Sequence, residues 1–255
     1  MAIRVAQVSK GFRARDNAEL TEVLDAIDFT VDDASVVAVF GPNGCGKSTL
    51  LNVVSGVYAP DTGDVQVAEV APERVRLGYA LQNFRDSLLP WESALNNVAF
   101  GLRAIGVERT SARRRAREFV EEHGLGIPLD RYPYQLSAGQ QQLVALARTL
   151  IQKPANLLLD EPFIALDHEA RFRIQDHVEL MVRSGSATMI FVSHDIDEAL
   201  YMSDKLILLS RRPARILSRF EVPFPHPRSH ELLTSSAFSE LRNAVIGEFI
   251  REVGG

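Results

Sequence analysis

Cysteine is nearly missing from this sequence of 255 residues, which contains only Cys45. A single cysteine excludes a framework of internal disulfides and is typical of a protein that works in a reducing cytoplasm. The sequence also has no excess of positive charge. It contains 28 lysines and arginines and 33 aspartates and glutamates, so the formal net charge is −5. This balance argues against a protein whose task is to hold nucleic-acid phosphates.

Long apolar runs are also absent. The apolar stretches, at residues 35–40, 155–159, 188–192 and 206–209, fall far below the ~20 residues that a helix needs to cross a bilayer. The first residues lack the long apolar stretch of a secretory signal, so we expect none. If the protein serves a membrane, we expect it to do so as a peripheral partner.

The short apolar runs predict an α/β fold. They are rich in valine, isoleucine and leucine, which is typical of strands in a parallel sheet covered on both faces. The alternation of such runs with helical stretches predicts helices between the strands. The predicted helices cover residues 47–57, 92–105, 111–123, 138–152, 168–183 and 195–202.

Other segments predict additions to this core. Strands near residues 4–8, 26–31 and 64–67 predict an antiparallel N-terminal β subdomain. Residues 83–135 are mostly helical and predict an inserted helical subdomain. We expect a single domain over residues 1–255. Its C-terminal tail, about residues 211–255, contains an apolar stripe with the spacing of one helix face, which predicts a helix packed on the domain; the stripe consists of Phe238, Leu241, Val245 and Phe249.

A phosphate-binding loop is the first motif that carries chemistry. Residues 41–48 read GPNGCGKS and match G-x-x-x-x-G-K-[ST] at every fixed position, after an apolar strand and before a helix. Glycines allow backbone N–H groups to turn toward phosphates, and the helix N-terminus adds its positive end. Lys47 is expected to neutralise the β/γ oxygens, and the Ser48 hydroxyl to ligate Mg²⁺. The residues expected to contact ATP here are Gly41, Pro42, Asn43, Gly44, Cys45, Gly46, Lys47, Ser48 and Thr49.

A second motif, LLLDEP at residues 157–162, places two carboxylates at the end of an apolar strand. Alone, such a pair is usually a turn or a helix cap. Beside a phosphate loop, Asp160 is expected near Mg²⁺ and Glu161 near the attacking water as general base.

A third motif identifies the type of ATPase. Residues 136–140 read LSAGQ and open a predicted helix, which resembles the LSGGQ signature of ABC ATPases. In that family the signature contacts the γ-phosphate held by the opposite subunit, so the resemblance implies a dimer, expected here as a homodimer. The resemblance implies that five residues contact the ATP of the opposite subunit. Four belong to the signature, and the fifth lies in a D-loop-like segment after the second motif: Ser137, Ala138, Gly139, Gln140 and Asp167.

The remaining family motifs occur in the expected order. Gln82 matches the Q-loop glutamine, which touches Mg²⁺ and senses the membrane partner, and His194 matches the switch histidine that contacts the γ-phosphate. Phe12 matches the aromatic residue that stacks on adenine. The resemblance covers about residues 4–220 and implies a P-loop NTPase cassette with a RecA-like core. It departs from the family pattern at Ala138 and Leu143, where glycine and arginine are usual; the extra methyl of Ala138 could slow turnover.

Several stretches narrow the resemblance to the importer ATPases for nitrate, sulfonate and taurine. These are LLPW at residues 88–91, HDIDEAL at 194–200 and LSRRPARI at 209–216. That family implies an importer with integral-membrane permease subunits, a solute-binding protein and a location on the cytoplasmic face of the membrane, and no nucleic-acid partner. It does not define the cargo.

Two alternatives are less consistent with the sequence. A soluble ABC ATPase that acts on ribosomes or DNA would usually carry two cassettes or a long coiled-coil insertion, whereas this sequence has one phosphate loop, one signature and no sustained heptads. A catalytically dead regulatory cassette is disfavoured because Lys47, Asp160, Glu161 and His194 are all present.

Overall fold

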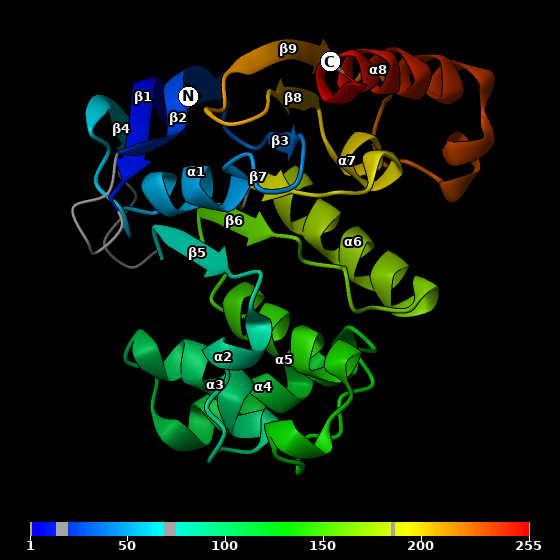
Figure 1. The fold of residues 1–255 in the computed structure, drawn as a ribbon. Coiled ribbons are helices and arrows are strands. Elements are labelled where there is room, and N and C mark those ends of the chain that lie inside the picture. Colours follow the sequence, from blue (N-terminus) through cyan, green and yellow to red (C-terminus); the bar gives the residue numbers. More distant parts are fainter. Residues whose placement is uncertain (1, 14–19, 69–74, 185–186, 255) are drawn as a thin grey trace. The chain divides into compact units, whose positions relative to one another are not determined.

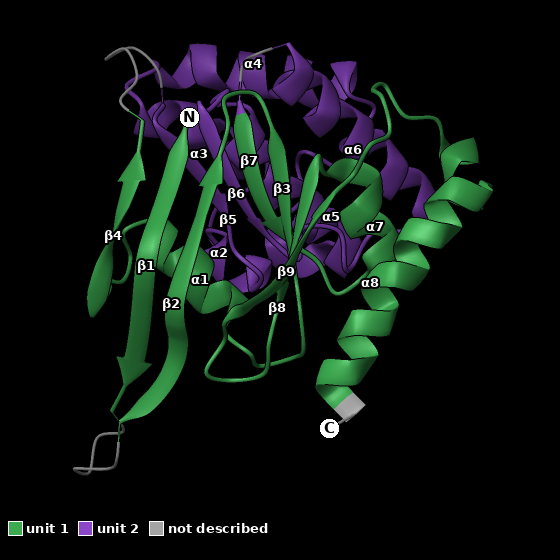
Figure 2. Cartoon of the chain, turned by 90° about the horizontal axis from the view of Figure 1, so that it is seen from above, with its two compact units in different colours: residues 1–69, 188–255 green, residues 70–187 purple. Residues whose placement is uncertain are grey.

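The chain forms two compact units in a computed structural model that describes residues 2–13, 20–68, 75–184 and 187–254 (Figure 1). The first unit combines residues 1–69 with 188–255, and the second comprises residues 70–187 (Figure 2). The expectation of a single domain with a helical insertion at 83–135 stays a prediction.

An antiparallel sheet opens the first unit, with strand order β2-β1-β4. It consists of β1 (Ile3–Phe12), β2 (Thr21–Val31) and β4 (Thr62–Val67). The three strands predicted in this region are therefore confirmed, and both strand pairs are antiparallel as expected. The apolar side chains of Ile3, Val5 and Val8 on the central strand are buried.

A second group of strands in the first unit follows the order β7-β3-β8-β9. They are β3 (Val36–Phe40), β7 (Thr188–Val192), β8 (Lys205–Leu209) and β9 (Ile216–Glu221). The three predicted runs pair in parallel, and β3 and β7 are buried at every position, which explains their continuous apolar sequences. Strand β9 was not predicted; it pairs antiparallel with β8.

Three α-helices complete the first unit in its described part: α1 (Lys47–Val54), α7 (Ile196–Met202) and α8 (Ser236–Gly254). A short 3₁₀ helix, η2 (His230–Thr234), precedes α8. The predicted apolar stripe does pack on the unit. Phe238 and Val245 are fully buried, and the ring of Phe249 lies 5.2 Å from that of Phe40.

The second unit has a parallel pair of strands, β5 (Leu77–Ala80) and β6 (Asn156–Asp160). Its helices are α2 (Phe84–Ser87), α3 (Ala94–Ala104), α4 (Arg109–Glu122), η1 (Pro133–Gln135), α5 (Ala138–Leu150) and α6 (His168–Arg183). Helix α3 packs against both α4 and α5. Side-chain caps define where helices begin, as at Ser93 and Asp167, whose oxygens accept backbone N–H groups of α3 and α6.

Among the described residues, no helix is both long enough and apolar enough to cross a bilayer.

Candidate functional site

The predicted phosphate loop connects β3 to α1 in the first unit. Gly46 is the residue before the helix and has a φ of 129°, a backbone conformation that side chains rarely allow. A Cβ at Gly46 would also lie 2.8 Å from Cγ1 of Val23. The second fixed glycine of the motif is therefore required by both backbone conformation and space.

The ammonium group of Lys47 is held inside this loop. Lys47 is 6% exposed, and its Nζ donates to the carbonyl oxygens of Gly41 at 2.8 Å and Pro42 at 3.0 Å. An ammonium has three N–H donors, so these two bonds leave one donor for an anion. Burial of a cation with spare donor capacity fits a site that receives phosphate oxygens. The neighbouring Cys45 is buried, and burial raises the pKa of its thiol.

His194 leaves the sheet at the same edge as the phosphate loop. Strands β3 and β7 are parallel, with Val39 opposite Val192, so residues that follow these positions emerge at corresponding ends. His194 is exposed. The residue before it, Ser193, is buried and accepts the Asp195 N–H at 3.0 Å, which holds the backbone on either side of the histidine.

Phe12 ends β1 and is 38% exposed, as a residue that offers its ring to a ligand must be. Its ring meets that of Tyr58 edge to face at 5.3 Å. Asp61 fixes this strand end by accepting from Lys10 Nζ at 2.6 Å and from the Gly11 N–H at 2.7 Å. The bonds from Lys10 and then Gly11 lower the pKa of the Asp61 carboxyl. Asp61 was not predicted as a site residue, although its place in the sequence Pro-Asp directly before β4 could have suggested it.

The two carboxylates of the second motif lie in the second unit. Asp160 is the last residue of β6 and is 3% exposed, and Glu161 follows with a φ of 49°. The side chain of Gln142 holds this turn at two points: its Nε2 donates to the Glu161 carbonyl at 3.1 Å, and its Oε1 accepts the Ala165 N–H at 2.8 Å. Gln142 is 3% exposed, so helix α5 positions the general-base candidate through a buried amide.

The signature residues begin helix α5. Ser137 is the N-cap: its Oγ accepts the Gln140 N–H at 3.2 Å, and Gln140 Oε1 accepts the Ser137 N–H at 3.1 Å. A hydroxyl that accepts from the backbone keeps its own proton to donate, so capping and phosphate binding are compatible. Ser137 is exposed, and Gly139 approaches the next loop so closely that a Cβ would lie 2.7 Å from the Ala165 carbonyl oxygen.

Two other expected site residues lie in the same unit. Gln82 is exposed between β5 and α2. Helix α2, which follows Gln82, is tied to α5 at its last residue, because Arg148 donates to the Ser87 carbonyl at 2.7 Å and to its hydroxyl at 2.9 Å. Asp167 is exposed and caps α6, with its carboxylate accepting the Ala170 N–H at 2.8 Å. Helix α5 thus begins with the signature and holds both α2 and the turn after β6.

The residues expected to hold Mg²⁺ have suitable chemistry. Ser48 offers a hydroxyl, Gln82 an amide oxygen and Asp160 a carboxylate. These are hard oxygen donors, and Mg²⁺ is commonly bound by one or two carboxylates together with phosphate oxygens and water. The donor set therefore fits the ion. Ser48 belongs to the first unit, and Gln82 and Asp160 belong to the second.

Comparison with known proteins agrees with this set of motifs. A family profile described as ABC transporter matches residues 24–164. The chain is 35% identical to the aliphatic sulfonates import ATP-binding protein SsuB of Bacillus cereus, over 98% of this chain and 97% of that protein. The chain belongs to the ABC transporter family. It is an ABC ATPase.

Other members of the family are similar over most of this cassette. The taurine import ATP-binding protein TauB of Rhizobium johnstonii is 34% identical, with 95% of this chain and 94% of that protein covered. The bicarbonate transport ATP-binding protein CmpD of Synechocystis is 36% identical, with 87% and 80% covered. The predicted resemblance to nitrate, sulfonate and taurine importer ATPases is confirmed.

Solved structures show the same fold. The ATP-binding cassette MJ0796, in a dimeric post-hydrolysis state with ADP and phosphate, superposes with a TM-score of 0.76 at 26% identity, covering 88% of this chain and all of that one. The predicted fold class, an α/β P-loop ABC cassette with a RecA-like core and an N-terminal antiparallel β sheet, is confirmed. The structure has this antiparallel sheet together with a mixed sheet and helices. Nucleotide binding by this cassette is confirmed as well.

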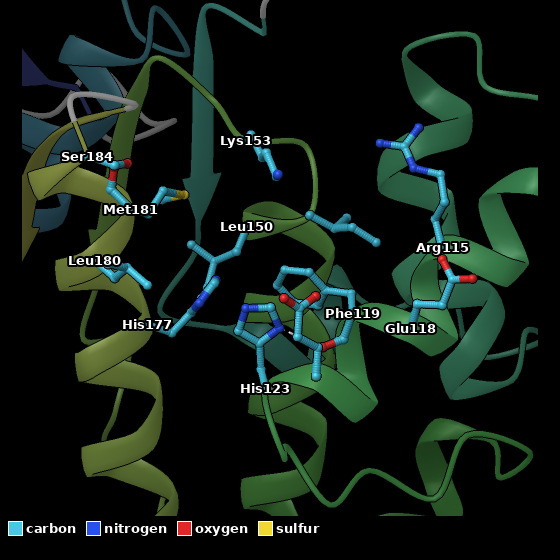
Figure 3. Close-up of a pocket in the computed structure, with 12 residues that line it drawn as sticks. Arg115, Glu118, Phe119, His123, Leu150, Lys153, His177, Leu180, Met181 and Ser184 are labelled. Carbon is cyan, nitrogen blue, oxygen red and sulfur yellow. Dashed lines mark hydrogen bonds between the residues drawn. The ribbon is translucent and has the colours of Figure 1, made fainter.

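A pocket of about 530 Å³ lies within the second unit of the cassette, and its lining includes none of the residues expected to contact ATP (Figure 3). Its wall comes from α4, the end of α5 and α6, and at its centre the rings of His123 and His177 meet at 3.7 Å, nearly perpendicular. His123 Nδ1 bonds the Phe119 carbonyl at 2.7 Å. The charged groups that line the pocket are Arg115, Glu118, Glu122 and Lys153.

The buried His177 in this pocket is expected to make the stability of the cassette depend on pH. Burial, followed by the nearby His123 and Lys153, lowers the pKa of His177 to about 4 from an ordinary value of 6.5. Above pH 6.5 the imidazole is neutral in both states; between pH 6.5 and 4 only the unfolded chain binds the proton. The free energy of unfolding should therefore fall as the pH falls through this window.

Urea unfolding of the wild type and His177→Phe between pH 7.5 and 5 tests this expectation. The variant should lose less stability on acidification than the wild type, whereas His168→Gln, a change at an exposed histidine, should follow the wild type. Equal pH slopes for wild type and His177→Phe would contradict the expectation.

Proposed function

We propose that this cassette is the ATPase subunit of an importer for nitrate, a sulfonate, taurine or a similar small solute. The observation that carries the proposal is the similarity over nearly the whole chain to ATP-binding proteins named for import of sulfonates and taurine. These names favour a transporter over the alternative of a soluble ATPase acting on ribosomes or DNA. The chain would then work on the cytoplasmic face of the membrane, bound to permease subunits that receive cargo from a solute-binding protein.

The proposed roles follow the chemistry of each residue. Lys47 and the N–H groups of residues 41–49 would bind the phosphates, with Phe12 against the adenine. Glu161 would take a proton from water as the water oxygen bonds to the γ-phosphorus and the bond to ADP breaks. His194 would contact the γ-phosphate. Held by Ser48, Gln82 and Asp160, Mg²⁺ would neutralise charge on the β- and γ-phosphate oxygens.

The signature would act on ATP held by a second copy of the chain. Ser137 is an exposed helix cap with a hydroxyl proton to donate, and the N-terminus of α5 adds the positive end of the helix dipole. Ala138, Gly139 and Gln140 share this helix start, and Asp167 would contribute from the segment after β6. A solved relative of this cassette is described as dimeric, which supports the shared arrangement.

Copurification and transport together test the proposal. The genes that neighbour this one should encode a permease and a solute-binding protein, and the tagged chain should retain that permease in detergent. Vesicles that contain the complex should accumulate a candidate solute only with ATP and the binding protein. Stable recovery of the chain with ribosomes or DNA, and no permease, would refute the proposal.

The permease should dock on the inserted lobe at residues 83–135. Two aromatic side chains there are strongly exposed, Trp91 at 71% and Tyr134 at 75%, and exposed apolar groups of this size are frequent in interfaces. The double change Trp91→Ala/Tyr134→Ala should reduce permease retention and uptake at least about tenfold, with basal ATP hydrolysis unchanged.

A matched control is Leu180→Ala, which removes an apolar side chain that is 69% exposed on α6, outside this lobe. It should leave retention of the permease intact. Normal retention in the double variant would contradict docking on the lobe.

A further inference from the structure

The segment between β8 and β9 reaches the phosphate loop. Strand β8 is the parallel neighbour of β3, with Leu208 opposite Phe40, so both strands end at the same edge. In the turn that follows β8, Nη2 of Arg212 donates to the Gly44 carbonyl oxygen at 2.8 Å. Gly44 is in the middle of the loop, and none of the motifs assigned to ATP binding includes Arg212.

This contact constrains the peptide group between Gly44 and Cys45. A trans peptide is planar and directs its N–H opposite to its carbonyl. With the carbonyl held by Arg212, the Cys45 N–H faces the other way, where it bonds the Pro42 carbonyl at 3.3 Å across the loop. Arg212 therefore fixes the orientation of a backbone N–H in the loop that is expected to bind phosphates.

The turn that carries Arg212 is itself held from two directions. Toward β2, the Ala214 N–H bonds the Val23 carbonyl at 2.8 Å, and Nε of Arg215 donates to Asp25 at 2.6 Å. Toward the C-terminus, the Arg211 N–H donates to Oε1 of Glu252 at 2.8 Å. The Arg211 guanidinium also donates to the Val253 carbonyl at the end of α8.

Helix α8 is firmly placed, so it can hold this turn. Phe238 and Val245 are fully buried, and Arg242 pairs with Asp197 of α7 at 3.3 Å. Phe249 packs on Phe40, the residue that leads into the phosphate loop. Both the entry to the loop and its middle thus contact the C-terminal segment.

We propose that Arg212 is a positioning residue for ATP binding, and that α8 supports it through Glu252 and the Arg211 turn. The guanidinium orients the loop before nucleotide arrives, and its positive charge favours the phosphates. It makes no contact with the reacting atoms in this account, so its loss should weaken binding and leave the chemical step unchanged. The inference rests on the proposed assignment of residues 41–49 as the phosphate site.

Steady-state hydrolysis with the full-length chain tests the proposal. For Arg212→Ala we expect the KM for ATP to rise about three- to tenfold with kcat unchanged, since the bond is charge-assisted but exposed. Arg212→Lys keeps a cationic donor and should recover most of the affinity. Arg219→Ala is the matched control, because this exposed arginine of β9 donates to the Asp28 carbonyl of β2 at 2.7 Å.

A double-mutant cycle tests the support from α8. Glu252→Ala should raise the KM for ATP in the same direction, and its effect should shrink when Arg212 is already alanine. A normal KM in Arg212→Ala, or equal changes in Arg212→Ala and Arg219→Ala, would overturn the role of Arg212. Full additivity in the cycle would overturn the role of α8.

Equilibrium binding of ATP distinguishes a failure of the proposed role of Arg212 from a failure of the proposed phosphate site at residues 41–49. If Lys47→Ala binds ATP normally, residues 41–49 are not the phosphate site and the proposed site fails. If Lys47→Ala loses ATP while Arg212→Ala binds it normally, only the present inference fails.

Discussion

Glu161→Gln is expected to lower ATP hydrolysis by at least about 100-fold while ATP still binds, because the change removes a general base and keeps the shape of the side chain. The position of Glu161 makes the result interpretable. Its backbone is held from α5 by Gln142, and its carbonyl rather than its carboxylate accepts that bond. Glutamine at this position should therefore leave the fold of the turn intact.

A matched control is Glu169→Gln in the first turn of α6. That carboxylate belongs to an exposed ion pair with Arg173, at 3.4 Å, for which little effect on hydrolysis is expected. Rapid hydrolysis by Glu161→Gln would contradict the assignment of the base, whereas loss of both hydrolysis and ATP binding would indicate damage to the site rather than removal of a base.

Lys47→Ala is expected to weaken ATP binding at least about 100-fold and to abolish measurable hydrolysis at ordinary ATP concentrations. The change removes a buried cation aimed into the phosphate loop, and charge-assisted bonds to phosphate are among the strongest that a side chain makes. Fluorescence titration with a labelled ATP analogue measures the loss directly.

Lys205→Ala provides the control for Lys47→Ala. Lys205 is a half-buried lysine of the same unit that pairs with Asp32 and Glu221 at 3.7 and 3.6 Å. Circular dichroism should show that both variants are folded. Near-normal turnover in Lys47→Ala would contradict the proposed phosphate site.

The sequence was sufficient for the core elements because their signals are local. Helix α6 spans the predicted residues 168–183, since Asp167 caps its start and its apolar positions recur with helical spacing. The predicted helix at 47–57 ends earlier, at Val54. Two residues later, Gly56 takes a φ of 81°, which is not a helical conformation. The predicted start at residue 92 moves to Ala94 because Ser93 is the cap.

Strand β9 was missed although its sequence contains a usable signal. Ile216, Ser218 and Phe220 are half-buried and alternate with exposed residues, which is typical of a strand with one face in solvent. The nearby prolines and the arginine-rich turn are more typical of irregular structure, so they obscure this signal.

The site was predictable where motifs define it, and unpredictable where contacts span the sequence. Residue type and spacing pointed to Lys47, Asp160 and the signature. Neither spacing nor periodicity could show that Gln142 bonds the backbone of Glu161 and Ala165, or that Arg212 reaches Gly44 across 168 positions. Such pairs depend on how the strands and helices pack, which local patterns do not encode.

The central claim is that two copies of this cassette share each ATP. The most direct measurement is the solution mass of Glu161→Gln by light scattering, with and without ATP and Mg²⁺, alongside Glu161→Gln/Ser137→Asp. Aspartate is as good a helix cap as serine, so it preserves α5 while its negative charge repels the γ-phosphate. The account predicts a dimer for Glu161→Gln only with ATP, and a monomer for the double variant under the same conditions. An ATP-bound Glu161→Gln protein that stays monomeric, or a double variant that dimerises equally well, would contradict it.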